Sequence, residues 1–237
     1  MSDNSAAPLE YVYKFTLSDG SVKRASIRLD RKTLSLIPKP PQAYPPWARL
    51  SRHQCVNCPL KESEHPQCPI AANLVELVDD FRDSTSHEEA EVEVSTADRR
   101  YIKRTAIANG ISSLIGIYMV TSGCPIMDKL KPMVRTHLPF SSWEETLFRF
   151  TSTYMLAQYF LHQAGKTPDW TMEKMSSLTN EHNLVNQSFC KRLTDAHILD
   201  ATLNAVVHLD AFALMTSHFM VEGRIDELAP LFDAYLP

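Results

Sequence analysis

The sequence predicts an α+β fold in which a small N-terminal antiparallel sheet with a cysteine cluster packs on a C-terminal helical bundle. Apolar residues first recur with a period near two, as in half-buried strands, and later with a period of about 3.6, as in amphipathic helices. The 237 residues are 44% hydrophobic and 22% charged, which is ordinary for a globular protein. We expect two regions: residues 1–98, β-rich with the cysteine segment, and the helical bundle, 99–237.

Four strands are expected. The stretch "YVYKFTL" at 11–17 alternates apolar and polar residues, an Asp-Gly turn follows, and "VKRASIRL" at 22–29 completes a hairpin. A third short strand is expected in "TLSLIP" at 33–38. A fourth is expected in "HEEAEVEVST" at 87–96, where alternating glutamates indicate one face in water.

Between these strands lie a connecting segment and one helix. Five prolines in "PKPPQAYPPW" at 38–47 interrupt regular structure, so we interpret this stretch as a linker, with a polyproline ligand for a partner as the alternative. The apolar residues of "IAANLVELVDDF" at 70–81 share one stripe, which predicts a helix.

From Tyr101 onward the helical period predicts five or six helices joined by short turns. One of them has capping-box spacing at its start, Ser142 and Glu145, and Gly165 at its end. The others are expected around 107–118, over 125–135, from "PDWTMEKM" at 168, over 196–220 and in "IDELAPLFDAY" at 225.

Charge and composition narrow the function classes. The formal net charge of -4 gives no basic footprint for phosphate backbones, so no nucleic-acid partner is expected. The N-terminal residues lack the pattern of a signal peptide and no apolar run suits a spanning helix, so we expect no membrane association and a cytoplasmic protein. In a reducing compartment, clustered cysteines are more often metal ligands or reactive thiols than disulfides.

The cysteine cluster is "HQCVNCPLKESEHPQCPI" at 53–70. Cys55 and Cys58 have the two-residue gap typical of zinc ligands, and Cys68 follows ten positions later. His65 would complete a local site, with His53 as a further candidate. A thiol redox pair is disfavoured because a proline follows Cys58 and no βαβ unit surrounds the motif.

Cys124 is the alternative fourth ligand. Cys68 and Cys124 each precede a proline, a residue favoured at the first position of a helix, where the helix dipole favours a thiolate. A site of Cys55, Cys58, Cys68 and Cys124 would link the cysteine segment to the bundle, and we favour it over one completed by His65. The expected cofactor is a structural zinc ion, with an iron-sulfur cluster as the alternative.

A rival hypothesis is a metal- or thiol-dependent enzyme or redox sensor with a pocket near Cys124, Arg135, His137 and Glu144. Whether the chain is an enzyme stays open, because the Walker, GxSxG and HExxH signatures are absent from the sequence. A third interpretation, an adaptor that uses its helical surface or proline linker, predicts a large exposed apolar patch.

Several phrases taken together resemble a family of uncharacterised bacterial proteins, a domain of unknown function in which they recur in this order: "HQCVNCPL", "CPIAANL", "TSGCPIMDKLKPMVRTHLPF", "EETLFR", "LAQYF" and "PDW". The resemblance extends from about Tyr11 onward. It implies that the two Cys-Pro regions are parts of one family motif, with Cys55, Cys58, Cys68 and Cys124 at the motif positions. It implies no reaction.

Overall fold

The computed structural model describes residues 7–198 and 200–236, and these have the α+β fold that the sequence predicts. The strands are β1 (Leu9–Leu17), β2 (Val22–Leu29), β3 (Glu89–Ser95) and β4 (Arg100–Ala106), which form an antiparallel sheet in the order β2-β1-β3-β4. The α-helices are α1 (Pro69–Asp80), α2 (Ile107–Thr121), α3 (Trp143–Gln163), α4 (Met175–Asp195) and α5 (Ala201–Val221). The 3-10 helices are η1 (Pro46–Ala48), η2 (Met127–Thr136) and η3 (Arg224–Phe232).

One face of the sheet is buried because its strands alternate in phase. Tyr13 lies opposite Val94 and Phe15 opposite Val92, so the apolar residues of β1 and β3 reach the same side. Phe15 packs edge-on against Phe81, with ring centroids 4.9 Å apart, just beyond the end of α1. The sheet thereby covers α1 and α2 and forms part of the main core.

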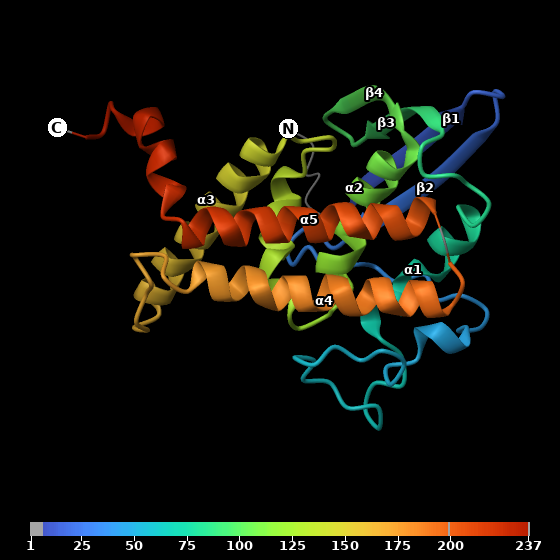
Figure 1. The fold of residues 1–237 in the computed structure, drawn as a ribbon, viewed down its shortest axis with the longest axis horizontal. Coiled ribbons are helices and arrows are strands. Elements are labelled where there is room, and N and C mark those ends of the chain that lie inside the picture. Colours follow the sequence, from blue (N-terminus) through green and yellow to red (C-terminus); the bar gives the residue numbers. More distant parts are fainter. Residues whose placement is uncertain (1–6, 199, 237) are drawn as a thin grey trace.

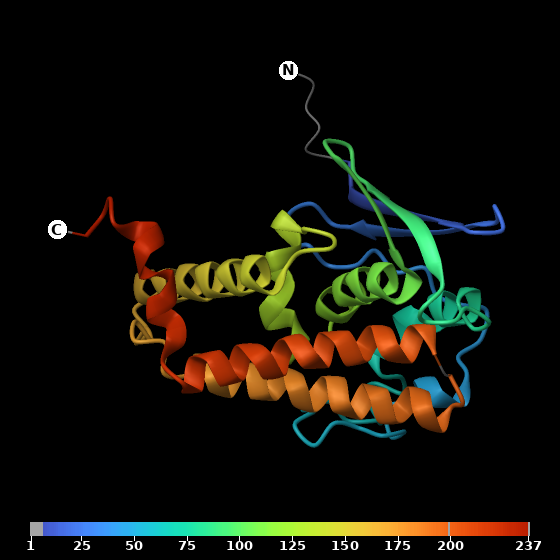
Figure 2. The ribbon, with the colours of Figure 1, turned by 45° about the horizontal axis from the view of Figure 1, so that its top comes forward.

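The helices lie in layers beneath the sheet. Figures 1 and 2 show α2 between the sheet and a pair of long neighbouring helices, α4 and α5. The segment between η1 and α1, which holds three of the cysteines, loops along the outer side of α4 (Figures 1 and 2).

Much of the predicted secondary structure is confirmed. The hairpin 11–29, the helix at 70–81 and the strand within 87–96 are present, and Gly165 follows the end of α3 in a left-handed conformation. Ser142 and Glu145 form the reciprocal capping box at the start of α3, with donor-acceptor distances of 2.8 and 3.2 Å.

Two expectations about strands are wrong. The stretch 33–38 contributes only one isolated bridge, between Leu29 and Leu36. Residues 100–106 form β4 rather than the start of helical structure. This edge strand is mostly exposed and carries arginine and lysine, which protect a sheet edge but hide the alternation that marks a strand. Because β3 pairs with β4, the sheet extends across the boundary expected at 98–99.

Three expectations about helices also need correction. The segments expected at 125–135 and from 225 are 3-10 helices, η2 and η3, and each has an internal proline that lacks the amide proton a longer α-helix needs. The helix expected over 196–220 begins at Ala201, after α4 has ended at Asp195.

Candidate metal centre

The structure brings four cysteines to one small cavity. Cys55, Cys58, Cys68 and Cys124 all line a space of about 20 Å³, which is room for a single water-sized group. The remaining wall is largely apolar, and it includes one buried cation, Arg192. Its other residues are Leu50, His53, Gln54, Leu60, Pro69, Ile70, Ile126, Val185 and Phe189. Residues far apart in the sequence therefore share one thiol-rich site.

The cysteine segment is a loop with a fixed base. The backbone N–H of Cys68 donates to the carbonyl of Ala48 at 2.8 Å, and that of Leu50 donates to the carbonyl of Pro66 at 3.0 Å. Inside the loop, the N–H of Cys58 donates to the carbonyl of Cys55 at 3.0 Å, a tight turn consistent with the two-residue gap. Cys68 is the N-cap of α1, with proline at the first helical position as expected.

Cys124 reaches the cavity from the end of α2. It follows Gly123, whose φ of +87° gives the backbone a turn that glycine adopts without strain. Burial raises the pKa of Cys124 more than hydrogen bonds with the backbone of Met127 and Ile126 lower it, and burial raises the pKa of Cys55 to about 11. The thiolate expected at Cys124 is therefore not favoured at neutral pH unless a cation replaces the proton.

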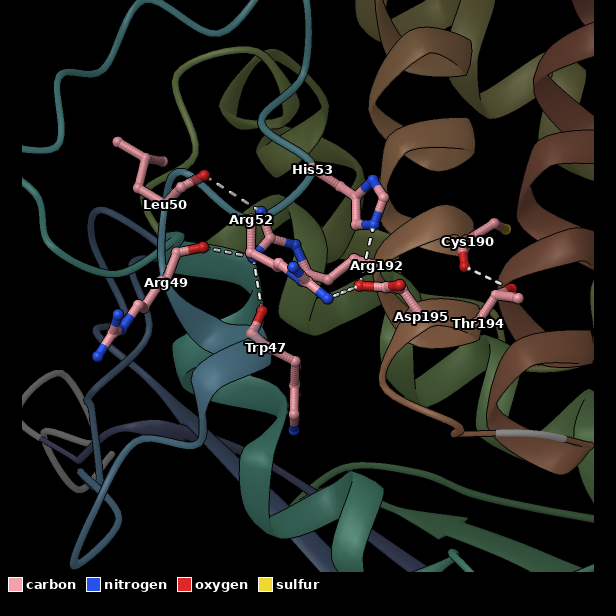
Figure 3. A network of polar contacts seen from close by, with 9 residues as sticks. All are labelled: Trp47, Arg49, Leu50, Arg52, His53, Cys190, Arg192, Thr194 and Asp195. Carbon is pink, nitrogen blue, oxygen red and sulfur yellow. Dashed lines mark hydrogen bonds and ion pairs between the residues drawn. The ribbon is translucent and has the colours of Figure 1, made fainter.

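Arg192 on α4 fixes the base of the loop from the inside. Its guanidinium donates to the carbonyls of Trp47 and Arg49, each at 2.6 Å, and to that of Leu50 at 3.4 Å (Figure 3). The side chain is buried, and no carboxylate pairs with it within the described ranges. Burial lowers the pKa of Arg192, whereas the adjacent thiols of Cys68 and Cys55 act to raise it. A buried cation without a carboxylate partner in the described ranges thus borders the cysteines.

Further contacts attach the outer part of the loop to α4. Arg52 and His53 both pair with Asp195, the histidine at 3.3 Å (Figure 3). The side-chain amide of Asn57 donates to the carbonyl of Glu181 at 3.0 Å. His53, expected as a further ligand, lines the cavity while it contacts a carboxylate.

His65 lies apart from this site. It is exposed, near the base of the loop, and does not line the cavity. Of the two candidates for a fourth ligand, Cys124 is the one placed with the other three cysteines. As the side chains stand, however, no three or more histidine, cysteine, aspartate or glutamate residues in 7–198 and 200–236 form a group that could hold a metal ion. The thiols surround a space rather than a point.

The pocket expected near Cys124, Arg135, His137 and Glu144 is not one site. Arg135 and Glu144 are exposed, and Arg135 donates to the carbonyl of Arg31 at 2.7 Å. His137 instead lines a second, larger cavity, where its Nε2 lies 2.7 Å from the Tyr13 hydroxyl. The expectation is corrected because η2 ends between these residues and turns their side chains in different directions.

Sequence reasoning missed Arg192. The available signal was its spacing: Val185, Phe189 and Arg192 follow the i, i+4, i+7 pattern of one helix face, so a charged residue interrupts an apolar stripe. An arginine in that position is rarely buried without partners, and here its partners are backbone carbonyls.

Comparison with known proteins identifies a family but adds no chemistry. Neither the curated proteins nor the solved structures include a match to the chain. None of the helices within the described ranges combines the length and the hydropathy that crossing a membrane requires. A family model described as a domain of unknown function, DUF6901, matches residues 10–233, and the chain belongs to that family.

Proposed function

We propose that this protein binds a metal centre through Cys55, Cys58, Cys68 and Cys124, and that the centre joins the cysteine loop to the helical bundle. The single observation that carries the proposal is the convergence of these thiols on one small cavity from two segments of the chain. Clustered thiols in such surroundings are the usual ligands of zinc and of iron-sulfur clusters.

The charge of the surroundings supports the same proposal. Four thiolates around a divalent ion, or around an iron-sulfur core, carry a net negative charge, which is costly to bury without a counter-charge. Arg192 supplies a buried positive charge at the cavity, and it has carbonyl partners but no carboxylate in the described part of the chain. The two groups would each offset the cost of burying the other.

Zinc and an iron-sulfur cluster make different demands on the four sulfurs. A zinc ion draws all of them to about 2.3 Å from one point. A cluster is larger, so its sulfur ligands stay further apart around it. A space of about 20 Å³ suits a single ion better than the larger core of a cluster, and the Cys-x-x-Cys gap is also typical of zinc, so zinc is the expected metal.

The role proposed for the centre is structural. Cys124 belongs to the main core, and Cys55 and Cys68 pack against it, so the centre would lie between loop and bundle rather than at an open mouth. A cross-link of residues more than fifty positions apart removes much conformational entropy from the unfolded chain. The enzyme or redox-sensor alternative requires a coordination position open to substrate.

Anaerobic purification followed by metal analysis and a visible absorption spectrum tests the proposal. Stoichiometric zinc in a colourless sample, or iron with inorganic sulfide in a brown sample, would support it and identify the centre. The Cys190→Ser variant is the matched control, since Cys190 is a free, partly buried cysteine outside the cavity. Protein that is folded but holds neither metal would overturn the proposal.

A further inference from the structure

Helix α4 also borders a second cavity, of about 600 Å³, which is lined by other residues than the thiol-lined space. This volume lies in the range of small-molecule sites, and it is far larger than the space between the thiols. Its wall is built mainly from β4, α2, η2, α3, α4 and α5 and is mainly apolar. The bulky apolar members include Met119, Met127, Leu130, Met133, Leu138, Phe140, Phe150, Leu209, Phe212 and Met215. The cavity is independent of the proposed metal centre.

Polar atoms in the wall of this cavity lack partners. Trp143 Nε1, Arg149 Nε, His182 Nε2 and Asn186 Oδ1 are all shielded from solvent and make no hydrogen bond, and all four residues line the cavity. Leaving such an atom unpaired costs about 1–3 kcal/mol, so four around one space are unusual unless something in that space pairs with them. The side chains of His182 and Asn186 are almost completely buried, at 3% and 2% exposure.

The charges in the wall have one sign. Arg149 and Lys103 are cations, and of the residues that the structure describes no aspartate or glutamate lines the cavity. Arg149 donates one N–H to the carbonyl of Met133 at 2.8 Å, which leaves its Nε free, and it makes no ion pair within the part of the chain that is described. Glu145, four residues away, is occupied by the capping box. The cavity therefore lacks an anion.

Two histidines of the wall, His137 and His182, do not change this balance, because burial keeps them neutral. Burial, with Arg149 nearby, lowers the pKa of His137 to about 3. Burial and the charge of Lys129 lower the pKa of His182 to about 4. Around Asn186 the unpaired atoms are thus a carbonyl oxygen and an imidazole nitrogen, which suit a ligand that carries a hydroxyl or amide donor.

We infer that this cavity binds an organic carboxylate with a largely apolar body and a hydroxyl or amide donor away from the carboxylate. The carboxylate pairs with Arg149, whose free Nε–H is a charge-assisted donor. The apolar body fills the space between the methionine and phenylalanine side chains, and the donor reaches Asn186. This assignment gives each kind of unpaired atom a complementary partner.

Isothermal titration calorimetry with 10-hydroxydecanoate as the probe tests the inference. We expect 1,10-decanediol, which lacks the carboxylate, to bind about tenfold more weakly or worse, since a hydrogen bond to a charged group contributes roughly 1.5–3 kcal/mol. The Arg149→Met variant should lose the same factor for 10-hydroxydecanoate and leave the diol unaffected. Arg135→Met is the matched control, because it removes an exposed arginine that does not line the cavity.

Two further arms keep the test decisive if Arg149→Met fails to fold. Ala213→Trp places a large side chain in the cavity wall and should abolish binding of the probe while the circular dichroism spectrum stays unchanged. Decanoate, which has no hydroxyl, should bind to the wild type more weakly than 10-hydroxydecanoate does. In the Asn186→Leu variant the two acids should bind with equal affinity. Equal affinity of the acid and the diol, or unchanged binding to Ala213→Trp, would overturn the inference.

Discussion

Helix α4 forms a wall of two cavities that differ in size and chemistry. Val185, Phe189 and Arg192 face the small, thiol-lined space, whereas His182 and Asn186 face the large one. The volumes are about 20 and about 600 Å³. In the small cavity a buried cation lies beside thiols that become anions when they bind metal. In the large cavity Arg149 and Lys103 have no aspartate or glutamate beside them among the described residues of the wall.

The two sites therefore depend on different parts of the structure. The small one can be completed by an ion and then acts as a cross-link, so changes there should alter metal content and stability. The large one is proposed to bind an organic ligand, and we expect the fold to stay intact when that ligand is absent. Substitutions at the two sites should therefore separate stability from ligand binding.

The largest effect is expected from removal of a thiol. Cys124→Ser should release the metal and lower the free energy of unfolding by roughly 5 kcal/mol or more, because the binding energy of a structural metal is part of the folding energy. Metal analysis and urea unfolding measure both quantities. Cys190→Ser and His65→Ala should retain the metal and most of the stability; a loss of metal in His65→Ala, with none in Cys124→Ser, would contradict the placement of the fourth ligand.

A smaller effect is expected from the arginine that borders the thiols. Arg192→Met leaves three carbonyls at the base of the loop without their donor and should cost about 3 kcal/mol in urea unfolding. Arg52→Met removes a half-exposed arginine of the loop that pairs with Asp195 of α4. It should cost less than about 1 kcal/mol. Similar losses in the two variants would show that the buried guanidinium does not fix the loop.

At the large cavity, acid should destabilise the fold through His182. Its pKa is about 4 in the folded protein against 6.5 for an ordinary histidine, so below pH 6.5 the unfolded chain takes up a proton that the folded chain excludes. This stability is present above pH 6.5 and is lost as the pH falls toward 4; at pH 5 the loss is roughly 2 kcal/mol.

Urea unfolding at pH 7 and at pH 5 checks this sign. The wild type should lose about 2 kcal/mol more than His182→Gln between the two conditions, because glutamine takes up no proton. His218→Gln, which replaces an exposed histidine on α5, should behave like the wild type. An identical pH dependence in His182→Gln would mean that the buried imidazole is charged in the folded state.

The sequence predicted those parts of the fold whose signals are local. The alternation in β1 and β3, the apolar stripe of α1 and the capping box of α3 each depend on residues within one segment, and they are present. Edge strand β4 carries no such signal, since most of its residues are exposed and its pairing with β3 is decided by the chain reversal between them.

The two cavities also differ in whether the sequence indicates them. Cysteine is rare in this chain, so three of five cysteines within one segment mark a site in the amino-acid sequence itself. The large cavity is built from ordinary methionine, phenylalanine, asparagine and histidine residues of several helices. Only the packing of these helices brings their unpaired atoms together. From the sequence alone, each of these residues would be predicted to lie in the core or on the surface.

The smallest effects should distinguish the two faces of α2. Gly110 and Gly116 both lie inside this helix, so replacement by alanine gains the same helix propensity, about 1 kcal/mol. At Gly110 the new Cβ would lie 2.6 Å from Phe15 Cε1 and 3.0 Å from Val92 Cγ1, and such overpacking costs about 1–3 kcal/mol.

At Gly116, which lines the large cavity, the nearest atom to the new Cβ is Leu209 Cδ2 at 3.7 Å, an ordinary contact. Gly116→Ala should therefore stabilise the protein by about 0.5–1 kcal/mol, whereas Gly110→Ala should be neutral to destabilising by about 2 kcal/mol. Because propensity cancels between the two variants, their difference in urea unfolding measures packing alone. Equal effects would mean that the helix packs as loosely against the sheet as it does beside the cavity.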